Sequence, residues 1–222
     1  MSMASPGNAS PPATRPKKFR PPGREQIIES RVARKPMDTM ETDLTVETYH
    51  LHVELLDSDP YIWRQIAVRG NVSLTELHQV LVAAMGWSGE ADYVFKGQGR
   101  VLANGEVSSL STLLTQPEET LIYNYAPAQG WLHKVTLKAI SQPEHFVNAP
   151  VDHPLPYCTA GERQCPPEFC NGVWDYVDLI DRLGDGDDPD EIDALWQKVG
   201  YDFDPERFDL AAANQRLQAL AQ

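Results

Sequence analysis

The sequence contains no run of about 18 apolar residues and no apolar segment near its start, so it shows neither a membrane-spanning helix nor a secretory signal peptide. Its three cysteines are too few, and odd in number, for the disulfide framework of a small secreted domain. We therefore expect a cytoplasmic protein with reduced thiols and no membrane contact.

Familiar catalytic signatures are also missing. The chain has no Gly-x-Ser-x-Gly elbow, no phosphate-binding P-loop, no His-Glu-x-x-His motif and no Gly-x-Gly-x-x-Gly dinucleotide fingerprint. The hydrolase, kinase, zinc-protease and dehydrogenase classes therefore lack their usual support. Whether the protein is an enzyme stays open at this point, and a role without catalysis is favoured.

Charge divides the chain into two parts. The 222 residues have a formal net charge of -13, yet residues 1–40 contain eight Lys and Arg against three Asp and Glu. Residues 41–222 contain eleven against twenty-nine, a net charge of 11 − 29 = −18, which disfavours general binding of nucleic acid by this part. We predict that residues 1–43 form a disordered, basic, proline-rich tail, and that nucleic acid contacts only residues 15–35.

A folded pattern begins at about residue 44. The stretch "VETYHLHVELL" alternates and places four apolar side chains on one face, and the turn-like "DSDP" and "PYIWRQIAV" that follow predict a hairpin. Next, "SLTELHQVLVAAMGW" predicts an amphipathic helix, because Ser73 and Glu76 have capping-box spacing before it. The four alternating residues are Tyr49, Leu51, Val53 and Leu55.

The remaining pattern predicts strands first and helices last. This order favours an α+β fold, with a mostly antiparallel sheet, one early helix packed on it and a C-terminal group of about three helices. No Gly/Ser linker interrupts residues 44–222, which we interpret as one domain. Further strands are predicted at 92–97, 120–126 and 131–140, a helical turn at 108–114, and helices at 173–183, 190–199 and 209–221.

Four motifs follow one another along residues 47–217. They are Pro-x-Ile-Trp-Arg at 60–64 with a helix that ends in Gly-Trp at 86–87, Trp-x-His at 131–133, Cys-x-x-Gly-x-x-x-Cys-Pro-Pro-Glu at 158–168, and Phe-Asp-Pro-x-x-Phe-Asp at 203–209. In this order they resemble the plasmid pRi open-reading-frame-three-like family. The resemblance implies an uncharacterised protein associated with plasmids and mobile elements, and it supplies no catalytic residues.

Three cysteines lie within thirteen residues at 158–170. A structural zinc site usually has two close pairs of ligands, and Cys158, Cys165 and Cys170 meet only half of that pattern. Such a site would need a fourth ligand, such as His153 or, failing that, His145. A reactive thiol is a second interpretation. The third is that these are small buried side chains in a loop stiffened by two prolines, and we favour it.

Other notable side chains are expected to be structural. Arg163 and Glu168 are spaced to pair across the cysteine loop or to cap the next helix, and the Asp-rich stretch at 184–191 is placed to cap a helix rather than to bind calcium. We expect each histidine either to lie on a half-solvated face of the sheet or to form a hydrogen bond within the fold. We expect three tryptophans to lie mostly in the core. These residues are His50, His52 and His78, and Trp63, Trp87 and Trp131.

Two functions follow from these observations. The first is a non-enzymatic accessory or interaction module with a protein partner, linked to nucleic-acid transactions through that partner or through the basic tail. The second is a zinc-dependent enzyme that uses Cys158, Cys165 and Cys170. We favour the first, and the sequence does not identify the partner.

Overall fold

The computed structural model describes residues 46–102, 108–142 and 154–220, which all belong to one compact unit. The predicted tail, residues 1–43, lies outside these ranges, so its disorder and its contact with nucleic acid stay predictions. Within the described ranges, no helix has the length and apolar character needed to cross a membrane.

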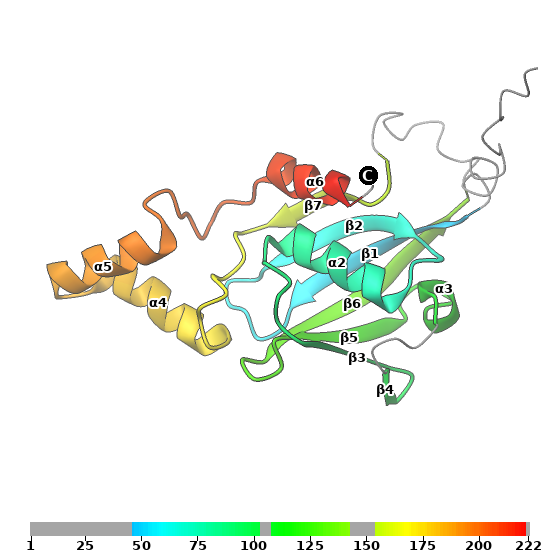
Figure 1. The fold of residues 1–222 in the computed structure, drawn as a ribbon, viewed down its shortest axis with the longest axis horizontal. Coiled ribbons are helices and arrows are strands. Elements are labelled where there is room, and N and C mark those ends of the chain that lie inside the picture. Colours follow the sequence, from blue (N-terminus) through cyan, green and yellow to red (C-terminus); the bar gives the residue numbers. More distant parts are fainter. Residues whose placement is uncertain (1–45, 103–107, 143–153, 221–222) are drawn as a thin grey trace, which may run out of the picture. The chain divides into compact units, whose positions relative to one another are not determined.

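A seven-stranded sheet forms the centre of the described unit (Figure 1). Its order is β4-β3-β5-β6-β1-β2-β7, and each neighbouring pair is antiparallel, which confirms the predicted type of sheet. The strands are β1 Thr48–Leu55, β2 Trp63–Arg69, β3 Tyr93–Gly97, β4 Arg100–Leu102, β5 Thr120–Tyr125, β6 Trp131–Ser141 and β7 Tyr157–Glu162.

The predicted hairpin is β1 and β2, with Leu51 opposite Ile66 and Glu54 opposite Trp63. The alternation in β1 sends every second side chain to the inner face of the sheet, and Val53 there is 0% exposed. Full burial of one such aliphatic side chain contributes about 1.5–3 kcal/mol, so this face is a main source of stability.

Helix α2, Leu74–Met85, lies across the sheet (Figure 1). The capping box is present, because the Glu76 main-chain N–H donates to Ser73 Oγ over 3.2 Å and the Ser73 N–H donates to the Glu76 carboxylate over 2.7 Å. The helix ends at Gly86, whose φ of 92° is left-handed and therefore favours glycine. Leu77 and its neighbours on one face are buried against the sheet.

Two strands were not predicted, β4 and β7. Strand β7 begins just before the segment that we interpreted as a cysteine loop and runs into it, and it pairs with β2 at the edge of the sheet. Its sequence, YCTAGE, has no apolar alternation to reveal it. The edge is covered by a side chain from the C-terminal helix, because the Cys158 main-chain N–H donates to Asn214 Oδ1 over 2.7 Å and the Asn214 amide donates to the Cys158 carbonyl over 3.0 Å.

The predicted C-terminal helices are present, but they do not form one group. Helix α6 packs on α2 and β7, whereas α4 and α5 contact each other. Asp188 caps α5, as predicted for the Asp-rich stretch, since its carboxylate accepts from the N–H groups of Asp190 and Glu191. The helices are α3 Leu110–Leu113, α4 Val173–Asp185, α5 Pro189–Val199 and α6 Leu210–Ala219.

Candidate functional site

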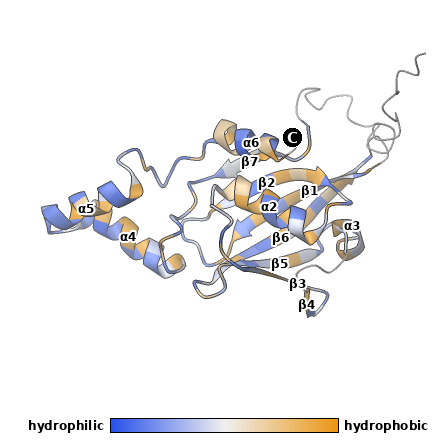
Figure 2. Cartoon of the chain, in the orientation of Figure 1, coloured by the Kyte–Doolittle hydropathy of each residue, from blue (hydrophilic) through white to orange (hydrophobic). Residues whose placement is uncertain are grey.

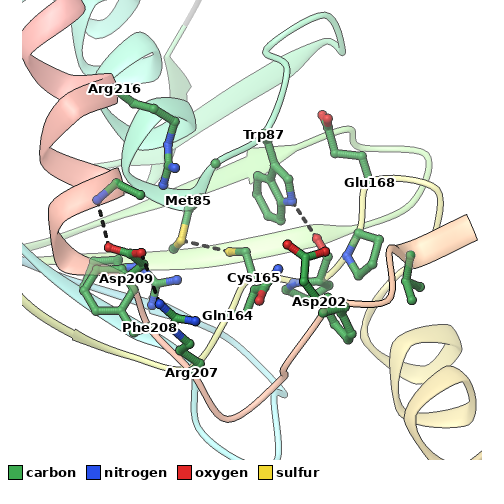
Figure 3. Close-up of a pocket in the computed structure, with 17 residues that line it drawn as sticks. Met85, Trp87, Gln164, Cys165, Glu168, Asp202, Arg207, Phe208, Asp209 and Arg216 are labelled. Atoms are coloured by element: carbon green, nitrogen blue, oxygen red, sulfur yellow. Dashed lines mark hydrogen bonds and ion pairs between the residues drawn. The ribbon is translucent and has the colours of Figure 1, made fainter. Parts of the chain in front are cut away.

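A cleft of about 530 Å³ opens between the end of α2, the segment after β7, the chain before α6 and α6 itself (Figure 3). It is lined by residues from three of the four motif stretches, including Arg64, Trp87, Cys165 and Phe208. Stretches far apart in the sequence therefore meet in one place. The volume is within the usual range for a small-molecule site.

Arg64 lies at this cleft and is only 1% exposed. Its guanidinium donates to the main-chain carbonyls of Trp63, Glu162 and Arg163 over 2.7, 2.8 and 2.8 Å, and more weakly to that of Ala84 over 3.4 Å. Burial lowers the pKa of this side chain from its usual value. The positive charge is thus satisfied by main-chain oxygens that join β2 to the end of β7.

A second arginine reaches the cleft from α6. Arg216 donates from Nε to the carbonyl of Ala83 over 2.7 Å and so ties α6 to the end of α2. The Arg216 guanidinium lies close to Gly86, because a Cβ added to that glycine would be only 3.3 Å from Arg216 Nη2. Nearby, Arg207 pairs with Asp209 over 3.6 Å.

Glu168 is held in a way that differs from our prediction. Its carboxylate accepts from the main-chain N–H of Ser88 over 2.8 Å and from the Tyr125 hydroxyl over 2.6 Å, which ties the Pro-Pro-Glu turn to the end of α2 and to β5. The expected pairing with Arg163 is wrong. Arg163 instead forms an ion pair with Glu206.

The three cysteines are buried and free. The Cys165 thiol contacts the Met85 sulfur over 3.2 Å at the wall of the cleft, and burial raises the pKa of Cys158, Cys165 and Cys170 to about 11 each. In the part of the chain that the structure describes, no three His, Cys, Asp or Glu residues are placed to hold a metal ion. His153 and His145 lie outside that part, so the zinc site remains a prediction.

The imidazoles in the described unit occupy structural positions. His78 forms a 2.8 Å hydrogen bond with the Tyr123 hydroxyl, which confirms the predicted hydrogen-bonded position. Its ring stacks on that of Tyr93, with the ring centroids 3.7 Å apart. His133 is 1% exposed and donates from Nδ1 to the Trp131 carbonyl over 3.0 Å, while its Nε2 has no hydrogen-bond partner among the described residues. Burial lowers the pKa of His133 to about 4.

Comparison with known proteins now identifies the family. The family described as "Plasmid pRiA4b ORF-3-like protein" matches residues 47–212. The chain belongs to this family. It is 25% identical to "Uncharacterized protein y4hQ" of Sinorhizobium fredii (strain NBRC 101917 / NGR234) over 191 residues, 80% of this chain and 94% of that protein.

A solved structure supports the assignment. The protein of unknown function MM3350 from Methanosarcina mazei Go1 is similar to this ORF-3-like protein, with a TM-score of 0.63 and 30% identity over 75% of this chain and 97% of that one. Neither relative has a described function. The function of the ORF-3-like protein must therefore be argued from its own residues.

The open face of the sheet holds a polar cluster. His52 forms a 2.8 Å hydrogen bond with the Tyr61 hydroxyl, which donates to Glu54 over 2.6 Å, and Trp63 lies beside His52 with ring centroids 5.4 Å apart. His50 and His52 are half-buried here, as predicted. Trp63 is half-buried too, so its predicted core position is wrong, whereas Trp87 and Trp131 are in the core.

The helical hairpin, defined as α4 and α5 (residues 173–199), is strongly acidic. No residue of α5 is buried, and Trp174 at the start of α4 is 80% exposed. Sequence reasoning missed Trp174, although its position between Val173 and Asp175, one residue off the apolar stripe, was a visible signal. Figure 2 shows hydrophilic residues along both helices.

Proposed function

We propose that this ORF-3-like protein is a non-enzymatic interaction module, and that its helical hairpin binds a basic surface of a protein partner. The observation that carries the proposal is the combination of an acidic hairpin and the 80% exposed side chain of Trp174. Residues 173–199 contain nine Asp and Glu against Arg182 and Lys198, a net charge of 2 − 9 = −7.

The arrangement of the hairpin supports this use. Helix α4 anchors the hairpin, because Val173, Tyr176 and Leu179 are buried in the core. No residue of α5 is buried, so this helix leaves most of its surface open to a partner. Its carboxylates face solvent, where they favour the approach of a positively charged partner. A solvent-exposed tryptophan beside them is the residue type that most often carries binding energy in protein interfaces.

The chemistry of the partner follows from this surface. A protein that uses a Lys- and Arg-rich face to bind nucleic acid fits the charge of the hairpin, and this supports the indirect link to nucleic-acid transactions. Residues 15–35, which are basic, provide a separate route to nucleic acid. The two routes have opposite charge, so they are separable by experiment.

The proposal is tested by quantitative affinity capture from lysate of the host, with the tagged full-length chain as bait. Two variants change the hairpin: Trp174→Ala, and the combination Asp178→Asn, Asp181→Asn and Asp185→Asn, all exposed positions on α4. We expect basic proteins that the wild type captures to be lost from both variants. We also expect capture to weaken as salt rises, because the charges involved are exposed.

The matched control removes the same number of charges elsewhere. Asp57→Asn, Glu90→Gln and Asp92→Asn are exposed positions outside the hairpin. The control is expected to capture the same proteins as the wild type. Equal loss from the control and the hairpin variants, or no loss from either, would contradict the proposal, and zinc content measured on the same wild-type preparation separates it from the metal-enzyme alternative.

A further inference from the structure

Three arginines line the cleft beside Cys165, and one of them, Arg207, is paired with Asp209. Arg64 and Arg216 both line it, and neither forms an ion pair with a carboxylate of the described residues. Both side chains donate to main-chain carbonyls, and the guanidinium of Arg64 also lies over the ring of Phe208, 4.0 Å from its centroid. Arg64 is a buried charge without a counterion, which is costly, whereas Arg216 is exposed; an anion beside both would neutralise the buried charge.

Both arginines keep hydrogen-bond donors for such an anion. A guanidinium has five N–H groups. Arg64 uses four of these in its bonds to Trp63, Glu162, Arg163 and Ala84, and Arg216 uses its Nε–H toward α2. The terminal N–H groups of Arg216 are therefore the larger set of donors that remain.

The acidic groups of the cleft do not neutralise this pair. Asp209 caps α6 and pairs with Arg207, and Glu168 accepts hydrogen bonds from Ser88 and Tyr125. Asp202 also lines the cleft, and it has no ion pair among the described residues (Figure 3). Its negative charge opposes an anionic ligand, so removing this charge should strengthen the binding of an anion and weaken that of a cation.

Part of the wall beside the arginines is apolar. Trp87 has its ring at the cleft (Figure 3), and its Nε1–H donates to the Pro166 carbonyl over 2.8 Å. Met85, Val199 and Phe203 line the same space. A small-molecule site commonly combines such walls with a few convergent polar groups. A ligand that fits this lining has a charged head group and an apolar body.

We propose that this cleft binds an organic anion, whose carboxylate or phosphate group lies between Arg64 and Arg216 while its apolar part contacts Trp87 and Phe203. Arginine forms strong, directed hydrogen bonds with both kinds of group. This inference goes beyond the proposed function, which concerns the helical hairpin, and it does not depend on it.

The experiment uses the full-length protein and four small probes of similar size. Benzoate and phenyl phosphate carry the negative head, benzyl alcohol is the neutral counterpart and benzylamine the cationic one. Binding is measured by calorimetry and by the shift of the unfolding midpoint. We expect one or both anions to bind saturably with one site per chain, and the alcohol and the amine to bind at least about tenfold more weakly, because a hydrogen-bonded charge is lost. The stronger of the two anions identifies the head group.

Variants locate the binding. Arg216→Met is expected to weaken anion binding about tenfold, since it removes the charge and keeps the length of the side chain, whereas Arg216→Lys is expected to lose less. Asp202→Asn is expected to strengthen anion binding by a few-fold, because a like charge is removed. Arg182→Met, at an exposed arginine on α4, is the matched control and should change nothing.

A second route covers the case in which Arg216→Met does not fold. Ala212 lines the cleft at the third position of α6, where glutamate is a favourable helix residue, so Ala212→Glu adds a fixed carboxylate at little cost to folding. It should weaken anion binding at least as much as Arg216→Met. Equal binding of benzoate and benzyl alcohol, undiminished anion binding in both variants, or no saturable binding of either anion would each overturn the proposal.

Discussion

Replacing Arg64 by methionine is expected to destabilise the protein strongly, although no carboxylate of the described residues pairs with it. Methionine keeps most of the length and the apolar stem but removes every donor. Three short hydrogen bonds, of 2.7, 2.8 and 2.8 Å, would be lost from the carbonyls of Trp63, Glu162 and Arg163. These carbonyls join β2 to the end of β7, so the edge of the sheet loses its internal link.

The size of the effect follows from two opposing contributions. Hydrogen bonds from a charged donor contribute about 1.5–3 kcal/mol each, so three of them represent roughly 4–9 kcal/mol. Burial of the cation opposes this by several kcal/mol, and methionine removes that cost. We therefore expect a net loss of about 3–4 kcal/mol, which for a chain of this size lowers the unfolding midpoint by roughly 10 °C.

Thermal and urea unfolding, followed by circular dichroism, measure this change directly. Arg64→Lys keeps the charge but not the fork of donors, and we expect an intermediate midpoint. Arg182→Met is the control at an exposed position, and because its ion pairs with Asp178 and Glu191 are on the surface, we expect a change of at most about 1 kcal/mol. A midpoint for Arg64→Met equal to that of the wild type would refute the reasoning, because it would show that the carbonyls do not need this donor.

Three further predictions concern the helix cap, a buried imidazole and the thiols. Ser73→Ala should cost about 1 kcal/mol in unfolding experiments, because it removes the cap of α2, whereas Ser109→Ala should cost less, since Ser109 makes no side-chain cap bond; equal costs would argue against the capping box. Burial lowers the pKa of His133 to about 4, below its unfolded value, so the unfolded state binds more protons between these values. Stability present above pH 6.5 is thus lost as pH falls toward 4, by on the order of 3 kcal/mol, and His133→Leu should flatten this dependence in pH-dependent urea titrations; an unchanged slope would contradict the assignment. A strong chelator should leave the midpoint unchanged, because the thiols are buried and protonated, whereas a fall abolished by Cys165→Ser would establish the zinc alternative.

Local patterns predicted the parts of the fold that depend on neighbours in sequence. The alternation of Tyr49 to Leu55 and the Ser73–Glu76 spacing each specify an element through contacts only a few residues apart. Strand β7 could not be predicted in this way, because its sequence has no alternation. It is held by Arg64 and by Asn214, which lie 98 and 56 residues from their partners in or beside the strand.

The candidate sites show the same division. Cys165 stood out in the sequence because cysteines clustered, but its neighbours in the cleft, Met85 and Arg216, come from α2 and α6 and carry no motif that joins them. The prediction that Trp63 lies in the core was wrong for a related reason. Its strand alternates, yet only the register of β1 and β2 decides which face is covered, and that face of β2 is open to solvent.

The most direct test of the interaction-module account is hydrogen–deuterium exchange of the full-length chain alone and in complex with a captured basic partner. The account predicts slower exchange on binding at residues 173–199, around the exposed Trp174, and unchanged exchange across β1 and β6. Protection confined to the open face of the sheet, with the helical hairpin unchanged, would contradict it.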